Sequence, residues 1–103
     1  MKKIFLLDDL RVFGVDVTAR TATQGYKVLE TEKFDEYLFD HDLGSIQPGT
    51  SGYDVLKWAL ENNKLSDHCT VFLVTSNPVG RQNMGNILQD YNFTFKGGTK
   101  YVR

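Results

Sequence analysis

Two apolar runs of the chain each end in a cluster of acidic residues, and this pattern restricts the fold more than any other feature. Residues 3–7 (KIFLL) precede an Asp-Asp pair at 8–9, and residues 36–39 (EYLF) precede Asp-His-Asp at 40–42. Both runs are typical of strands that are covered on both faces of a parallel sheet. Because the carboxyl ends of neighbouring parallel strands line one crevice, the two acidic clusters are predicted to face each other.

Carboxylates gathered in such a crevice need a counter-charge. At about 4 Å and an effective dielectric constant near 20, one like-charge pair costs roughly 4 kcal/mol. That is a large part of the about 5–15 kcal/mol that stabilises a domain of this size. A divalent cation with oxygen ligands is the simplest counter-charge. The alternative, that Asp8 and Asp9 complement a helix dipole, is less favoured because no good helix pattern follows them.

The chain of 103 residues is predicted to form one domain, residues 1–103, and its hydrophobic fraction of 41% suffices for one core. Its 12 basic and 13 acidic residues nearly cancel, so the charge does not favour binding of duplex nucleic acid or an anionic membrane. The single cysteine, Cys69, excludes an intramolecular disulfide and is interpreted as a buried structural thiol. With no apolar stretch of about 20 residues and no signal-peptide pattern, the expected location is the cytoplasm.

Apolar runs alternate with segments of helical periodicity, which predicts an α/β sheet with a largely parallel core. Thr21 or Thr23 can cap the first helix, and Asn77 followed by Pro78 is a typical helix start. The link between the first two strands is shorter than the roughly dozen residues of a parallel crossover, so the second strand is expected to be antiparallel or irregular. The predicted strands cover residues 2–7, 15–19, 36–40, 69–75 and 92–96, and the predicted helices cover 21–33, 53–62 and 77–90.

A polar turn, Thr75-Ser76-Asn77, follows the fourth predicted strand. Its hydroxyl, amide and backbone N–H groups lie at a helix start, where a phosphate oxygen is stabilised. Asn77 is explained equally well as a plain N-cap. Arg81, one turn into the helix, can reach the same anion, and Arg11 is placed similarly beside the first acidic cluster. Either arginine could equally be a solvated surface residue.

Two further residues at strand ends could take part in chemistry. If strand geometry continues, Asp40 and Asp42 point to one face of the sheet and His41 to the other. His41 is therefore interpreted as structural, although it could turn inward as a proton donor or ligand. His68 lies in a polar loop and is expected to be exposed. Lys96 ends the last predicted strand and can point along the crevice as the partner of a phosphate or carboxylate.

The whole chain resembles the receiver domain of response regulators. That family has an acidic pair after strand one, a phosphorylatable aspartate after strand three, a threonine or serine after strand four and a lysine after strand five. This chain departs from the receiver pattern in three ways. The receiver's first helix, between the first two strands, is missing, the loop at 43–51 is longer, and Gly97 stands where a proline normally follows the lysine. The matching residues are Asp8 with Asp9, Asp40, Thr75 and Lys96, together with Gly52 at a helix start.

A closer resemblance is to the cyclic-phosphate processing receiver-like family. It is carried by LDDLR at 7–11, FDHDLG at 39–44, TSGYDV at 50–55 and SNPVGRQNM at 76–84. The resemblance implies a receiver-like (flavodoxin-like) open, largely parallel sheet with helices on both faces and the first helix reduced or absent. It also implies processing of cyclic phosphates in RNA repair or nucleotide signalling, as in small stand-alone proteins of bacteria and phages. The family usually has a histidine where this chain has Thr75.

The resemblance and the acidic clusters together lead to a first hypothesis, a metal-dependent phosphoesterase. Its substrate would be a small nucleotide or an RNA 2′,3′-cyclic phosphate end, and a bound Mg²⁺ or Mn²⁺ would lower the pKa of a bound water. Without the family's histidine, a route that relies on it as a general acid would be lost. The expected metal ligands are Asp8, Asp9, Asp40 and Asp42, the expected catalytic residues are Asp40, His41, Thr75 and Lys96, and the expected phosphate-binding residues are Arg11, Ser76, Asn77 and Arg81.

Two alternatives use the same residues differently. In a receiver-type signalling module, Asp40 would accept a phosphoryl group, and the presence of Thr75 and Lys96 fits that role. In a sequestering protein, the pocket would bind a cyclic nucleotide without cleaving it. The sequence leaves the oligomeric state open.

Overall fold

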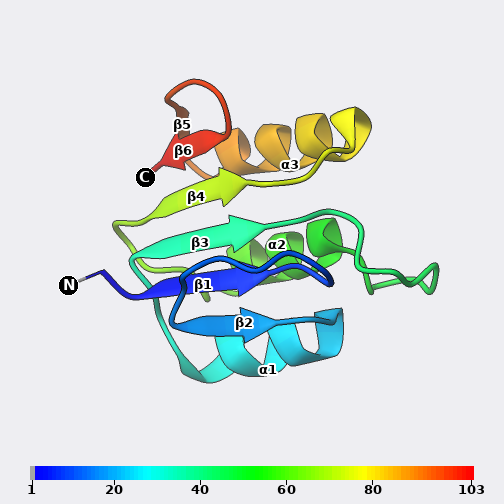
Figure 1. Cartoon of the computed structure of the whole chain (residues 1–103). Coiled ribbons are helices and arrows are strands. Elements are labelled where there is room, and N and C mark those ends of the chain that lie inside the picture. Colours follow the sequence, from blue (N-terminus) through cyan, green and yellow to red (C-terminus); the bar gives the residue numbers. More distant parts are fainter. Residues whose placement is uncertain (1) are drawn as a thin grey trace.

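A computed structural model describes residues 2–103 of the chain as a six-stranded mixed sheet with three helices (Figure 1). The order of strands across the sheet is β2-β1-β3-β4-β6-β5, and β1, β2, β3 and β4 are mutually parallel. This is the receiver-like, largely parallel α/β sheet that the sequence predicts. The strands are β1 (Ile4–Leu7), β2 (Val17–Ala19), β3 (Glu36–Phe39), β4 (Thr70–Leu73), β5 (Thr94–Phe95) and β6 (Lys100–Val102), and the helices are α1 (Ala22–Thr31), α2 (Gly52–Glu61) and α3 (Pro78–Asp90).

Each helix begins at a side chain that accepts a hydrogen bond from the first turn. Thr21 caps α1 by accepting from the backbone N–H of Gln24, as one of the two predicted caps. Ser51 caps α2 in a reciprocal capping box with Asp54, which satisfies two backbone donors at once. Asn77 caps α3 with Pro78 in the first turn, as predicted. These caps fix where each helix starts relative to the strand before it.

All three helices lie on the same side of the sheet (Figure 1). Their buried residues form one core with the side chains that point to that side from the strands, among them Phe5, Leu7, Tyr37 and Phe39. Helices were expected on both faces of the sheet, and the structure has them on one face only. The segment that would carry a helix to the second face, residues 8–16, is a loop, as the expected absence of the first helix implies. Among residues 2–103 no helix is long and apolar enough to cross a membrane.

The second strand corrects one prediction, because β2 is parallel to β1 rather than antiparallel or irregular. A connection between parallel strands needs many residues when it contains a helix. The connection from β1 to β2 contains none and only has to run back along the four residues of β1. Four residues span about 13 Å, a distance that the nine loop residues 8–16 cover easily in extended form. Asp16 fixes the return, since its carboxylate accepts from the N–H of Ile4 at 2.7 Å and its N–H donates to the Ile4 carbonyl at 3.0 Å.

The end of the chain corrects another prediction. A single last strand at 92–96 is expected from the sequence, but the structure has a hairpin of two short strands, and the tail forms β6 between β4 and β5. β6 is antiparallel to both neighbours. Gly97 and Gly98, both with positive φ, make the turn that a side chain would strain. The hairpin moves β5 to the edge of the sheet, one strand further from β4 than in a simple parallel order.

Candidate functional site

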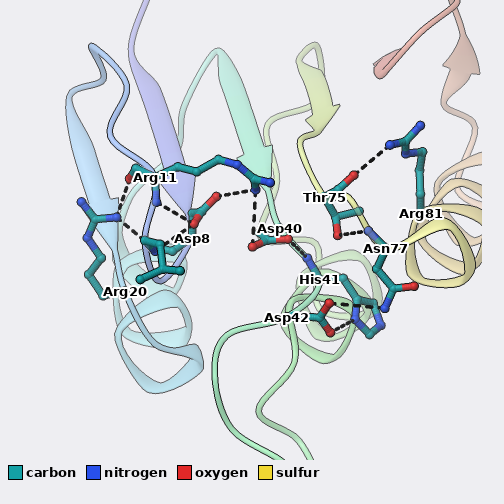
Figure 2. Close-up of polar contacts among 10 residues, drawn as sticks. Asp8, Arg11, Arg20, Asp40, His41, Asp42, Thr75, Asn77 and Arg81 are labelled. Atoms are coloured by element: carbon teal, nitrogen blue, oxygen red, sulfur yellow. Dashed lines mark hydrogen bonds and ion pairs between the residues drawn. The ribbon is translucent and has the colours of Figure 1, made fainter.

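The carboxyl ends of β1 and β3 place the two acidic clusters side by side (Figure 2). Leu7 and Phe39 are paired in the parallel register, so the residues that follow them leave the sheet at the same level. The N–H of Asp40 donates to the Leu7 carbonyl at 2.9 Å, which continues the ladder by one residue. The convergence predicted from the two strand ends is therefore present in the structure.

Three of the four predicted metal ligands come together at this point. Asp8, Asp9 and Asp40 each offer a carboxylate oxygen, and these oxygens all lie within 4.8 Å of one another. Asp8 and Asp40 are buried, while Asp9 is half-buried. The fourth predicted ligand, Asp42, lies outside this group, although it lines the same crevice.

The counter-charge in this cluster is an arginine. One nitrogen of the Arg11 guanidinium lies 3.0 Å from Asp8 Oδ2 and 3.6 Å from Asp40 Oδ2, so a single cationic group bridges the two strand ends. Its side chain is 38% exposed and therefore stands at the opening of the crevice. Arg11 was expected to bind phosphate, and the structure instead places it on the carboxylates.

The loop that carries Arg11 is held firmly by its backbone. Asp8 Oδ1 accepts from the N–H groups of Leu10 and Arg11 at 3.0 and 2.9 Å. The guanidinium of Arg20, just after β2, donates to the carbonyls of Asp8 and Arg11. Arg20 was not singled out in the sequence, because nothing in its local pattern distinguishes a brace from a surface arginine. The side chain of Arg11 can thus change its position while its main chain stays in place.

The two buried carboxyl groups have opposite pKa shifts. Burial by itself would raise the pKa of Asp8, but the N–H groups of Arg11 and Leu10 and the Arg11 guanidinium outweigh it and lower the pKa. Burial raises the pKa of Asp40, against the opposing hydrogen bonds from the Thr75 hydroxyl and the His41 N–H. Asp8 is thus a firmly ionised anchor, and Asp40 is the more basic of the two carboxylates.

Gly52, at the start of α2, permits the close approach of that helix to Asp40. A Cβ at this position would overlap the Asp40 carbonyl, and the Gly52 N–H donates to the His41 carbonyl at 2.7 Å. Gly44 has a positive φ of 76° and lies against Asp9, where a Cβ would come 3.3 Å from a carboxylate oxygen. These glycines let two loops close around the carboxylates.

The residues after β4 are occupied with one another and with local backbone (Figure 2). Asn77 Oδ1 accepts from the N–H of Gly80, and the Asn77 N–H donates to Thr75 Oγ1 at 3.1 Å. Arg81 donates to the Thr75 carbonyl at 2.9 Å instead of pointing at the carboxylates. Of the predicted phosphate-binding residues in this turn, only Ser76 is exposed on the crevice.

His41 does not line the crevice but pairs with Asp42, so the predicted alternation, with Asp40 and Asp42 on one face and His41 on the other, is not observed. Its Nδ1 lies 2.9 Å from Asp42 Oδ1, and its ring occupies the space that a Cβ on Gly80 would need. Asp42 in turn accepts from Asn77 Nδ2 at 3.3 Å and has a lowered pKa, chiefly through the His41 side chain. This chain of contacts joins the end of β3 to the start of α3 and gives His41 a positioning role.

Lys96 lies at the end of β5, exposed and separated from β4 by β6. It does not line the crevice, and its N–H is bonded to the Lys100 carbonyl within the hairpin.

Cys69 is buried and His68 is exposed, as expected, and burial raises the pKa of the Cys69 thiol to about 11. The crevice is lined by Asp8, Asp9, Leu10, Arg11, Asp40, Asp42, Gly44 and Ser76.

The donor set fits a small divalent cation. Carboxylate oxygens are the ligands that Mg²⁺ prefers, and opposite ligands of one Mg²⁺ lie about 4.2 Å apart. Three oxygens on one Mg²⁺ contain at most one opposite pair, and adjacent oxygens lie about 3 Å apart. The separations of up to 4.8 Å in the Asp8–Asp9–Asp40 group therefore have to shrink by up to about 2 Å when the ion binds. Arg11 would have to leave its place between Asp8 and Asp40, which its partly exposed side chain allows.

The comparison with protein families gives one clear result. The model of the cyclic-phosphate processing receiver domain matches residues 3–90, most of the chain. No curated protein and no solved structure matches the chain. The match covers the sheet from β1 to β4, all three helices and every residue of the crevice. The chain therefore belongs to the cyclic-phosphate processing receiver domain family.

Proposed function

We propose that this receiver-type domain is a metal-dependent phosphoesterase that opens a cyclic phosphate. The substrate would be a small cyclic nucleotide or the 2′,3′-cyclic phosphate end of an RNA. The observation that carries the proposal is the convergence of three carboxylates, from Asp8, Asp9 and Asp40, beside the partly exposed guanidinium of Arg11. A cation site next to a cationic side chain suits a phosphodiester, which needs its charge neutralised from two directions.

Some residues of the crevice would bind the metal and others would bind the phosphate. Asp8, Asp9 and Asp40 would hold Mg²⁺ or Mn²⁺, which when bound withdraws charge from a phosphate oxygen and lowers the pKa of a water. A cation on these carboxylates would compete with Arg11 for Asp8 and Asp40, and Arg11 would then be free to bind the phosphate bidentately. The exposed hydroxyl of Ser76 can donate to another phosphate oxygen from the opposite rim.

Asp40 is the residue best suited to the nucleophilic step. Its carboxylate lines the crevice, and the receiver resemblance matches it to the phosphorylatable aspartate. It would either take the proton of an attacking water or attack phosphorus itself. In the first case, the water oxygen bonds to phosphorus, one ring P–O bond breaks, and the leaving alkoxide takes up a proton from solvent in the open crevice. His41 and Lys96 take no part in this step, because neither lines the crevice.

One contact favours a second candidate, a phosphoacceptor module. The Thr75 hydroxyl is near enough to Asp40 to act against the rise in its pKa, so the residues that the receiver resemblance matches after strands three and four lie close together. Lys96, which matches the lysine of the receiver pattern, gives this candidate weaker support, because it lies two strands away from Thr75. A mass gain with acetyl phosphate that Asp40→Asn abolishes would establish this candidate.

The direct test is incubation of the purified chain with Mg²⁺ or Mn²⁺ and with 2′,3′-cyclic and 3′,5′-cyclic nucleotides, followed by chromatography of the products. We expect ring opening of at least one substrate, lost in Asp40→Asn and in Asp8→Asn. Asp42→Asn is the matched control, since it removes a crevice carboxylate outside the metal group. Tight binding of an intact ligand would indicate the sequestering function instead, and metal binding without turnover of any substrate would refute the esterase.

A further inference from the structure

The guanidinium of Arg11 lies where a cation shared by Asp8 and Asp40 would bind. One of its nitrogens is 3.0 Å from Asp8 Oδ2 and 3.6 Å from Asp40 Oδ2, between the two strand ends (Figure 2). An Mg²⁺ held by these two oxygens would lie about 2.1 Å from each. The ion and the guanidinium therefore compete for the same point.

The Arg11 side chain and the Arg11 main chain are held by different contacts. The Arg11 N–H donates to Asp8 Oδ1 at 2.9 Å, and the Arg11 carbonyl accepts from the Arg20 guanidinium. The side chain is partly exposed, and within residues 2–103 its guanidinium pairs with Asp8 and Asp40 alone. A turn of the side chain toward solvent would break these two ionic contacts and leave the main-chain bonds of the loop intact.

The charges at the opening of the crevice link a cation to an anion. Three carboxylates, from Asp8, Asp9 and Asp40, face one guanidinium, so the opening is negative when all three are ionised. A phosphodiester alone would be repelled there and could gain Arg11 only by taking it from the carboxylates. With a cation alone, the carboxylates gain a partner but Arg11 loses its own. With both ligands, the carboxylates pair with the cation and Arg11 pairs with the phosphodiester, so each charged group has a partner.

We propose that Arg11 is an internal competitor of the cation and thereby couples cation binding to phosphate binding. This inference rests on the proposed function and concerns how its site is loaded. Arg11 on Asp8 and Asp40 weakens cation binding, and a phosphodiester that binds Arg11 removes this competition. By linkage, the cation must strengthen phosphodiester binding by the same factor. The site would therefore bind its cation tightly mainly when a substrate is present.

Calorimetric titration with Mg²⁺, without and with dimethyl phosphate, tests this coupling. Dimethyl phosphate is a phosphodiester that has no ring to open, so the measurement does not depend on turnover. Without it, Arg11→Gln should bind Mg²⁺ about tenfold more tightly than the wild type, because a hydrogen-bonded ionic competitor is removed. With dimethyl phosphate, the wild type should gain more Mg²⁺ affinity than the variant, and the two affinities should converge.

The matched control is Arg81→Gln, which removes the same charge on the α3 side, where Arg81 donates to the Thr75 carbonyl. It should bind Mg²⁺ like the wild type, because Arg81 does not contact the carboxylates. The displacement itself can be followed in the wild type by NMR of the arginine guanidinium groups. The Arg11 signal should move toward that of a solvated arginine as Mg²⁺ binds, and it should move again when dimethyl phosphate is added.

The outcomes separate this inference from the esterase. Equal Mg²⁺ affinities of the wild type and Arg11→Gln, or an Arg11 signal that does not move at saturating Mg²⁺, would overturn the coupling and leave the esterase standing. So would an affinity gain in Arg11→Gln that dimethyl phosphate does not reduce. Coupling without ring opening of any cyclic nucleotide would refute the esterase alone. If neither chain binds Mg²⁺, the metal site and both proposals are refuted.

Discussion

The two halves of the crevice edge use polar residues in different ways. On the β1–β3 side, Asp8, Asp9 and Asp40 converge on a partly exposed Arg11, so ionic groups meet at an opening. On the β4–α3 side, Asn77 and Arg81 are bonded to nearby backbone groups. The first half can exchange a partner for a ligand, whereas in the second half Asn77 and Arg81 already have partners and Ser76 is the residue that stays open to the crevice. A polar residue at a strand end is therefore a weak indicator of a site until its local hydrogen bonds are known.

The largest expected effect concerns the backbone beneath the first half. Gly52→Ala would push a Cβ into the Asp40 carbonyl, which is main chain and cannot rotate away. We expect a loss of about 3–5 kcal/mol of the free energy of unfolding, measured by urea denaturation. Gly14→Ala is the matched control, because a Cβ there meets no atom within 4 Å. Equal stability of the two variants would contradict the close packing of α2 on the end of β3.

The same substitution in the second half should be milder. Gly80→Ala meets the His41 ring and also its Cβ at 2.9 Å, so the ring has to turn and the backbone has to shift slightly, and we expect a loss of about 1–3 kcal/mol. The Asp42 contact to His41 would be displaced with it. If Gly80→Ala proves as damaging as Gly52→Ala, the His41 ring is fixed more rigidly than its partial exposure indicates.

Asp8 and Asp40 should respond in opposite directions in metal-free protein. Asp8→Asn loses acceptor strength toward two N–H groups and Arg11, so we expect a loss of about 2 kcal/mol. Asp40→Asn removes a carboxylate whose pKa is raised by burial, so ionisation opposes folding and we expect a gain of stability at neutral pH. Chemical denaturation with chelator present gives both values.

The pH dependence of the wild type follows from the same two shifts. The lowered pKa of Asp8 means that its contribution is complete above the unfolded-state pKa near 3.9 and disappears as pH falls through the folded value. The raised pKa of Asp40 means that the folded chain holds that proton longer, so stability falls as pH rises from about 4 through its folded value. In Asp40→Asn this second decrease should vanish, and its persistence would show that another group causes it.

Much of the fold could be predicted from the sequence, because its signals are local. The strand runs, the Asn77–Pro78 helix start and the absence of the first helix all follow from neighbouring residues. The predictions of the direction of β2 and of a single last strand were wrong. The direction of β2 depends on what a short loop can span, and the hairpin of β5 and β6 depends on pairing between distant segments. The layer of helices on one side likewise depends on the path of the whole chain.

The candidate site divides in a similar way. The meeting of Asp8 with Asp40 follows from parallel register alone, which strand pattern predicts. The bridging position of Arg11 and the brace from Arg20 depend on side-chain directions in an irregular loop, where no periodicity applies. Lys96 was expected in the crevice because a single last strand would have placed it there, and the hairpin removes it.

The smallest effect should come from Asp42, and it decides whether the cation has three protein ligands or four. The Asp42 side chain is 65% exposed and bonds His41 and Asn77, so Asp42→Asn should cost no more than about 0.5 kcal/mol of stability. Its carboxylate lies outside the group formed by Asp8, Asp9 and Asp40, so calorimetric titration with Mn²⁺ should give nearly the wild-type affinity. Asp9→Asn, the half-buried member of that group, should weaken Mn²⁺ binding at least tenfold, because it removes a charged ligand. A comparable loss of Mn²⁺ affinity in Asp42→Asn would mean that Asp42 turns from His41 to bind the ion. Both halves of the crevice would then contribute residues to the cation site.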